Sequence, residues 1–204
     1  MKHLKKLMTL GLALSLALLC VGCGAKQEMP AEKEEGTEPQ ETVKACIDVV
    51  DFGKIELSLD PAAAPKTVEN FVKLAEEGFY DGLTFHRIIS GFMIQGGDPE
   101  GNGTGGSDAN IQGEFQDNGW ENPISHVRGT ISMARAADPN SASSQFFIVH
   151  EDSTFLDGQY AAFGTVTSGM EVVDAICEAA APVDGNGTIL PGNQPEIRSI
   201  TIVE

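Results

Sequence analysis

From Val43 onward, the apolar residues of this 204-residue chain fall into short runs separated by glycine, proline and asparagine. Such short runs suit β-strands, whereas a helix needs a continuous pattern of roughly ten residues or more. Many short strands with few helices favour a mainly β protein, and a closed antiparallel barrel over a parallel α/β sheet. The runs after the first hairpin that predict strands are residues 84–88, 93–95, 130–134, 145–149, 161–166 and 196–203.

One hairpin and two helices complete the pattern. The stretch "VKACIDVVDFGKIELSLD", which begins at Val43, predicts a hairpin that turns at residues 51–53, because apolar and polar residues alternate on its second arm. The helical spacing of apolar residues after Pro65 predicts a helix that Gly78 terminates. A second helix is predicted from Met170 to Ala179.

Residues 1–22 have the parts of a secretory signal peptide, namely a start with three lysines and an apolar run over residues 7–19. The run is too short for a spanning helix, which takes about 20 residues. The pair Gly22–Cys23 resembles the lipobox of bacterial lipoproteins, in which the cysteine is lipidated and becomes the mature N-terminus. Cys20 stands where leucine is usual. A Cys20-x-x-Cys23 redox pair and secretion without a lipid are the open alternatives.

Residues 23–42 are polar and charged, and they contain Pro30, Gly36 and Pro39. Such a segment cannot bury a core, so we expect a lipidated N-terminus followed by a disordered tether, with a solvated surface helix as the alternative. Together these features predict an extracytoplasmic protein that is anchored to the bacterial cell membrane by lipid on Cys23. The folded domain then covers residues 43–204.

The net charge of −17 excludes nucleic acid as a partner, because phosphates require lysine and arginine. Two cysteines, Cys46 and Cys177, lie inside the expected domain. They could form a disulfide outside the cytoplasm, but we expect two free, partly buried thiols.

Several kinds of site are not expected. "GNGTGG" fits the G-x-G-x-x-G pattern, but more loop follows it instead of a helix, which argues against a nucleotide site. His86, His126 and His150 are scattered without the spacing of metal ligands. Ser143 and Ser144 lack a recognisable setting for a nucleophile. We therefore expect no metal and no cofactor.

The stretch "FHRIISGFMIQGGD", which begins at Phe85, is very similar to the signature of the cyclophilin family of peptidyl-prolyl cis-trans isomerases. The resemblance covers residues 43–204 and implies an eight-stranded antiparallel barrel closed by two α-helices. It also implies that peptide binds outside the barrel, because side chains fill the interior. The further motifs, in the order of the family, are "NGTGG", "GTISMARA", "SSQFFI", "FLDGQYAAFGTV" and "GMEVVDAI".

The resemblance assigns roles residue by residue. Arg87 matches the catalytic arginine, and Gln95 matches the residue that holds the substrate backbone and that arginine. Phe92 joins this catalytic group and also forms part of the proline pocket. The expected substrate-binding residues are Met93, Phe147 and Leu156 in the pocket, Ala134 and Arg135 on the strand that pairs with the substrate, Gln145 beside them, and Phe155 and Tyr160.

Three positions depart from the commonest pattern of the family. Phe155 stands where many members have a tryptophan that donates a hydrogen bond to cyclosporin, so we expect weak cyclosporin binding. Tyr160 stands where many members have histidine, and its ring keeps an aromatic wall. Arg135 stands where asparagine is frequent, and its longer, charged side chain can alter substrate choice.

The chemistry needs few groups. Rotation about an X–Pro bond crosses a barrier of roughly 18–20 kcal/mol, because twisting breaks amide resonance. In the twisted state the proline nitrogen regains its lone pair, and a positive donor such as Arg87 stabilises that state selectively. No covalent intermediate is needed. We expect a monomeric isomerase for proline-containing segments of exported proteins. The alternatives are a binding module with little turnover and an acidic surface for a basic partner.

Overall fold

The computed structural model describes residues 41–203. The predicted signal peptide, Cys23 and all but the end of the tether lie outside the described residues. Within the described part, no helix combines the length and hydropathy needed to cross a bilayer. The elements are β1 (Val43–Val49), β2 (Gly53–Leu59), α1 (Pro65–Glu76), β3 (Thr84–Ile89), β4 (Met93–Asp98), η1 (Gln116–Asn118), β5 (Thr130–Met133), β6 (Phe146–Val149), η2 (Thr154–Leu156), β7 (Ala162–Ser168), α2 (Met170–Ala179) and β8 (Ile197–Val203).

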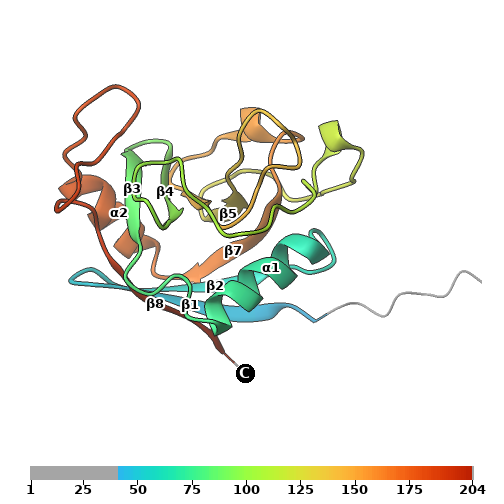
Figure 1. Ribbon diagram of the computed structural model, residues 1–204, viewed down its shortest axis with the longest axis horizontal. Helices are drawn as coiled ribbons and strands as arrows, with labels where there is room; N and C mark the ends of the chain where they lie inside the picture. The colour runs from blue at the N-terminus through green and yellow to red at the C-terminus, as the bar shows by residue number, and fades with distance from the viewer. Residues whose placement is uncertain (1–40, 204) are drawn as a thin grey trace, which may run out of the picture. The chain divides into compact units, whose positions relative to one another are not determined.

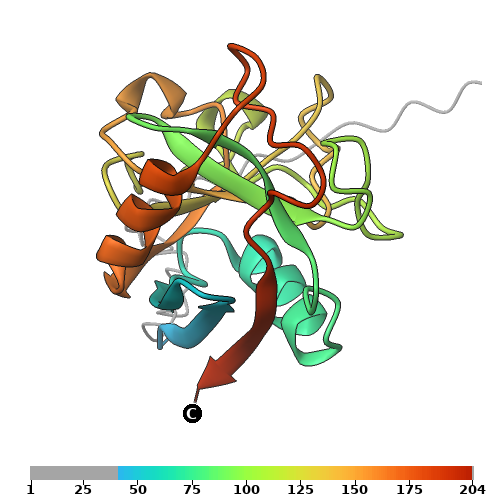
Figure 2. The same ribbon diagram turned by 90° about the vertical axis from the view of Figure 1, so that its left-hand side faces the viewer.

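The hairpin, both helices and all the predicted strands are confirmed, apart from shifts of one to three residues at some ends. The first helix begins at Pro65 and is followed by Gly78, whose φ of 69° is the left-handed conformation that favours glycine. The second helix has the predicted bounds. The strands form one antiparallel sheet in the order β3-β4-β6-β5-β7-β2-β1-β8. The sheet curves into a barrel, and α1 and α2 lie on different sides of it (Figures 1 and 2).

The predicted closure of the barrel is wrong. β3 and β8 are the two ends of the strand order, and no ladder between them is formed in the described residues. An isolated bridge joins Thr84 of β3 to Glu196, the residue before β8. The segment before β8 covers the edge of β3 instead, and the backbone N–H of Ile189 donates to the carbonyl of His86 over 3.0 Å. A loop thus satisfies the groups that a pairing strand would have used, and the barrel stays open.

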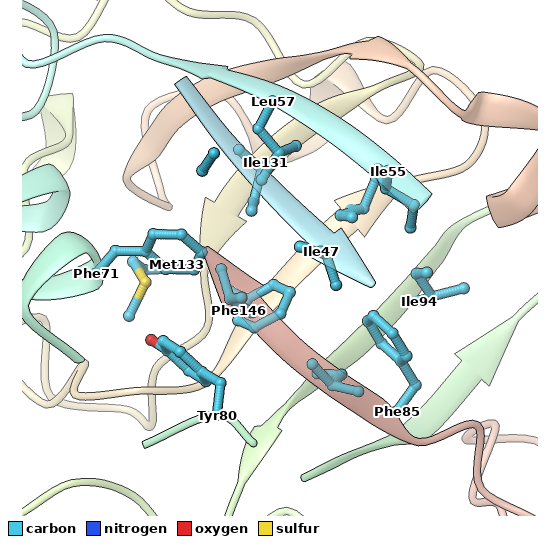
Figure 3. Close-up of a cluster of buried hydrophobic side chains, with 14 of the residues drawn as sticks. Ile47, Ile55, Leu57, Phe71, Tyr80, Phe85, Ile94, Ile131, Met133 and Phe146 are labelled. Atoms are coloured by element: carbon cyan, nitrogen blue, oxygen red, sulfur yellow. The ribbon is translucent and has the colours of Figure 1, made fainter. Parts of the chain in front are cut away.

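The interior of the barrel is filled by apolar side chains. Phe71 of α1 meets Phe146 of β6 edge-on with ring centroids 5.6 Å apart, and Tyr80 meets the same ring at 5.7 Å. A fully buried side chain of this kind contributes about 1.5–3 kcal/mol to stability. No ligand can enter this space, so a binding site has to lie on the outside. Figure 3 shows the cluster, with Ile47, Ile55, Leu57, Phe85, Ile94, Ile131 and Met133 among its members.

The two cysteines of the domain are not bonded to each other, as expected. Cys46 is half-buried on β1, whereas Cys177 is buried on α2. Burial raises the pKa of the Cys177 thiol to about 11. The thiol therefore stays protonated near neutral pH and packs as a small apolar group.

Candidate active site

The two faces of β4 and β6 contact different surroundings, because successive side chains of a strand point to opposite faces. Ile94 and Phe146 belong to the core of the barrel. Met93 and Phe147 belong to a second apolar cluster, together with Leu156. The alternation of the two strands therefore builds an apolar surface on the outside of the barrel.

This outer cluster forms part of a cavity of about 430 Å³. Most of the residues predicted for the site meet there, although they come from four separate stretches of the chain. The cavity is lined by His86, Arg87, Phe92, Met93, Gln95, Asn102, Gly103, Ala134, Arg135, Phe147, Leu156, Tyr160, Asn186 and Thr188.

Arg87 projects from β3 and is half-buried in the cavity wall. Its Nε donates to the carbonyl of Asn186 over 2.8 Å, and its Nη1 donates to Oε1 of Gln95 over 3.1 Å. Its guanidinium carbon lies 5.9 Å from the centroid of the Phe92 ring. In the part of the chain that the structure describes, no carboxylate forms an ion pair with Arg87. Burial lowers the pKa of Arg87, but arginine remains charged in proteins.

Gln95 connects Arg87 to the next part of the groove. The ladder places Gln95 directly opposite Arg87 on one side and Phe147 on the other. Its amide nitrogen donates to Oε1 of Gln145 over 2.9 Å, and Gln145 donates in turn to the carbonyl of Gly105 over 2.8 Å. The orientation of the arginine is thus linked to the glycine-rich loop at residues 101–106.

A loop that the sequence reasoning missed supplies the second acceptor of Arg87. The carboxylate of Asp184 accepts hydrogen bonds from the backbone N–H groups of Asn186 and Thr188, both over 3.0 Å. It also accepts one from the Thr188 hydroxyl over 2.9 Å. The bonds from Thr188 lead the causes that lower the pKa of Asp184. The signal was present in "DGNGT", since an aspartate followed by glycines predicts a turn of this kind.

Gly187 lets this loop approach β3 closely. Its φ of 84° is left-handed, and an added Cβ would lie 2.6 Å from the carbonyl oxygen of Ile88. Any other residue would push the loop away from the strand. The carbonyl of Asn186 would then no longer reach Arg87.

His86 also lines the cavity and was not among the predicted residues. It is only 4% exposed, and neither ring nitrogen has a hydrogen-bond partner among the described residues. Burial lowers its pKa. The ring is therefore a neutral polar group at the cavity wall. The β3–β4 ladder has an irregularity between Phe85 and Arg87, where His86 has no partner, so His86 and Arg87 both reach the cavity although they are adjacent in sequence. No spacing rule pointed to His86.

A series of hydrogen bonds centred on the buried ring of His126 supports Phe147 from behind. His126 Nδ1 lies 2.8 Å from a carboxylate oxygen of Asp157, and its Nε2 lies 3.0 Å from the Ser132 hydroxyl. Its ring stacks on Phe147 at an interplanar angle of 16°. The order Asp–His–Ser matches a hydrolase triad, but Ser132 is fully buried and no substrate can reach it. These hydrogen bonds therefore hold the ring of Phe147 in position at the wall of the pocket.

Two of the predicted site residues lie outside the cavity lining. Gln145 lines an adjoining cavity instead. Phe155 is 66% exposed and lines neither cavity, although its ring lies 5.6 Å from that of Phe92. Phe155 is therefore at the rim, whereas the next residue, Leu156, is buried in the pocket.

An open β-barrel with an arginine beside an apolar pocket on its outer face is the architecture of a prolyl isomerase of the cyclophilin class. The family model described as cyclophilin type peptidyl-prolyl cis-trans isomerase/CLD matches residues 46–202. The chain belongs to this family, and it is an enzyme that catalyses cis-trans isomerisation of prolyl bonds.

Named relatives agree with this assignment. Peptidyl-prolyl cis-trans isomerase B of Bacillus subtilis is 54% identical over 121 residues, which are 59% of this chain and 81% of the relative. A probable peptidyl-prolyl cis-trans isomerase of Brucella suis is 41% identical over 181 residues, covering 83% of this chain and 85% of the relative. The crystal structure of a Cryptosporidium parvum cyclophilin type isomerase in the presence of the dipeptide Ala-Pro has a TM-score of 0.69 and 31% identity. It matches 79% of this chain and 99% of that one.

Proposed function

We propose that the cavity around Arg87 is the site of isomerisation and that the enzyme acts on X–Pro segments of exported proteins. The single observation that supports this site most strongly is the guanidinium of Arg87, which hydrogen bonds hold in place without an ion pair, beside an apolar pocket. The dipeptide Ala-Pro named for the Cryptosporidium structure supports a proline-containing ligand for this groove.

Arg87 acts on the transition state. When the X–Pro bond twists, the proline nitrogen regains its lone pair, and a guanidinium N–H aimed at it stabilises this state more than either planar isomer. Gln95 and the Asn186 carbonyl hold the guanidinium in place, so little reorganisation is needed at the moment of rotation.

The apolar residues of the cavity hold the proline ring. Met93 and Phe147 are nearly fully buried and form the floor, while Leu156 closes one side. Tyr160 meets Phe147 edge-on at 5.8 Å and forms a wall. Because these groups exclude water, the field of Arg87 is less screened at the proline nitrogen. Ala134, which is half-buried beside them, offers backbone groups to the substrate chain.

The experiment is exchange NMR of a short Ala-Pro peptide with the wild-type chain and with Arg87→Ala. Removing the guanidinium should lower the exchange rate about 100-fold or more, by analogy with the loss of one transition-state donor. Arg198→Ala is the matched control, because Arg198 is exposed and its one ion pair among residues 41–203 is with Asp48. Peptide binding without faster exchange in the wild type would instead indicate a binding module.

The proposed location follows from the first 23 residues alone. The three lysines, the apolar run and the Gly22–Cys23 pair support export and lipidation. The test is membrane fractionation of a bacterium that expresses the full chain or Cys23→Ser, with mass spectrometry of the mature N-terminus. Release of the variant, with an acyl mass on the wild type, supports the anchor. A cleaved but unmodified wild type would show plain secretion.

A further inference from the structure

A second cavity, of about 310 Å³, adjoins the cavity around Arg87. The two share Gln95, Gly103, Ala134 and Arg135 in their linings. A peptide whose proline occupies the first cavity can therefore place another side chain in the second. Every residue that lines the second cavity is neutral except Arg135. It is thus a polar cavity with a single cation at the boundary with the proline site.

Arg135 is held in one orientation before any ligand binds. Its Nε donates to the carbonyl of Gln159 over 3.0 Å, and its Nη1 donates to the carbonyl of Ala136 over 2.9 Å. The guanidinium carbon lies 5.0 Å from the ring centroid of Phe115 and 4.8 Å from that of Tyr160. A side chain fixed in this way loses little conformational entropy when it binds a partner.

The charge of Arg135 is not neutralised within the described part of the chain. No carboxylate lies within ion-pair distance of its guanidinium there. Carbonyl oxygens and aromatic faces orient the cation but leave its net charge in place. The chain as a whole carries −17, so two arginines, Arg87 and Arg135, give the groove a local charge opposite to that of the molecule. A carboxylate is the side-chain group that a guanidinium binds best.

We propose that Arg135 makes this isomerase prefer X–Pro segments that carry an aspartate or glutamate close to the proline; the inference rests on the proposed function of the groove. Because an extended chain advances about 3.3 Å per residue, adjoining cavities place the acidic residue within about three positions of the proline. Arg87 acts on the proline nitrogen, and Arg135 selects the sequence around it.

The test uses pairs of peptides that are identical except for glutamate or glutamine at one position before or after the proline. For each pair, KM from exchange NMR and Kd from titration are measured with the full chain. The wild type should favour the glutamate peptide about fivefold at one of the positions. Arg135→Gln should bring that ratio to about one, whereas Arg198→Gln, which removes the same charge elsewhere, should keep it.

The ratio within each variant is independent of any general loss of folding or turnover, because both peptides meet the same protein. A wild-type ratio near one at every position would overturn the proposal, and so would a ratio that survives in Arg135→Gln. Failure of the isomerase function would show differently. Neutral peptides would then bind without faster exchange, while the ratio of Kd values would still report on Arg135.

Discussion

Phe146 and Phe147 are neighbours on β6, but they belong to opposite faces of the sheet. Phe146 is fully buried in the apolar core, where it packs against aromatic rings such as those of Phe71 and Tyr80. Phe147 is 5% exposed and lies between the ring of His126 and the cavity. One face of the strand is closed and filled, while the other keeps a hollow open. The difference shows that burial alone does not distinguish a core residue from a pocket residue.

The two faces are also stabilised differently. Apolar packing is sufficient inside the barrel, where the rings fill the space. A hollow has fewer atoms to pack against, so hydrogen-bonded groups hold its walls from behind. His126 does this for Phe147, and Asp184 does it for the loop that orients Arg87. We expect substitutions on the inner face to affect stability, and those on the outer face to affect activity.

The largest expected effect contrasts the two phenylalanines. Phe146→Ala leaves a closed cavity in the core and should lower the free energy of unfolding by about 3–5 kcal/mol. Phe147→Ala opens into an existing hollow that water can fill, so its cost should be nearer about 1–2 kcal/mol. Urea denaturation of both variants measures the difference. Equal losses would break the distinction between the two faces.

The inner face could be predicted from the sequence, because it follows from local periodicity. The alternation after Gly53 gave the second hairpin strand, and the spacing of Met170, Val173 and Ile176 gave the second helix with its observed bounds. Closure of the barrel could not be predicted in the same way. It depends on whether β8 or the loop before it pairs with β3, and that is a competition between distant segments.

The residues of the outer face could be predicted only where they belong to a motif of the family. The resemblance placed Arg87, Met93 and Gln95 in one cavity. Asp184 and His126 were missed, because their roles depend on contacts across large sequence separations. His126 meets Asp157 over 31 residues, and the loop at Asp184 meets Arg87 over about a hundred. The turn at Asp184 is indicated by "DGNGT", but neither of the two long-range contacts leaves a periodic or spaced signal in the sequence.

Asp184 sharpens the comparison, because it is exposed and is not a member of the core. Asp184→Ala removes the acceptors that hold the loop, so the Asn186 carbonyl should no longer fix Arg87. We expect kcat to fall about tenfold, since the guanidinium loses its aim, with a smaller change in KM. Exchange NMR over a range of peptide concentrations separates the two constants.

Two controls frame that result. Glu178→Ala removes an exposed carboxylate of α2 and should leave kcat unchanged. Asp184→Asn keeps one acceptor oxygen and should recover part of the rate. A rise in KM with an unchanged kcat in Asp184→Ala would mean that the loop binds the peptide and does not orient the arginine.

His126 should make the outer face sensitive to pH. Burial lowers the pKa of His126 from its ordinary 6.5, and the hydrogen bond that the ring donates to the Asp157 carboxylate offsets this only in part. Between the two pKa values the unfolded chain then binds more protons than the folded chain. The contribution of His126 to the free energy of unfolding is therefore fully present above pH 6.5 and is lost as the pH falls towards the lowered pKa. The slope for one group is at most about 1.4 kcal/mol per pH unit.

The measurement for His126 is urea denaturation between pH 7 and pH 5. His126→Gln should lower the slope of the unfolding free energy against pH by up to the amount that corresponds to one bound proton. His86→Gln provides the comparison, because burial lowers the pKa of His86 as well. An unchanged slope in His126→Gln would show that the ring keeps no proton-linked difference between the folded and unfolded states.

The smallest effect is expected at Phe155, at the rim of the outer face. Because this ring is 66% exposed, Phe155→Trp should change stability by no more than about 0.5 kcal/mol. The new indole N–H supplies the donor that the resemblance associates with cyclosporin, so affinity for the drug should rise about fivefold, as one added hydrogen bond allows. Calorimetric titration of both proteins measures this. Nanomolar binding by the wild type would contradict the expectation, because a donor at the rim would then be dispensable and the pocket alone would hold the ligand.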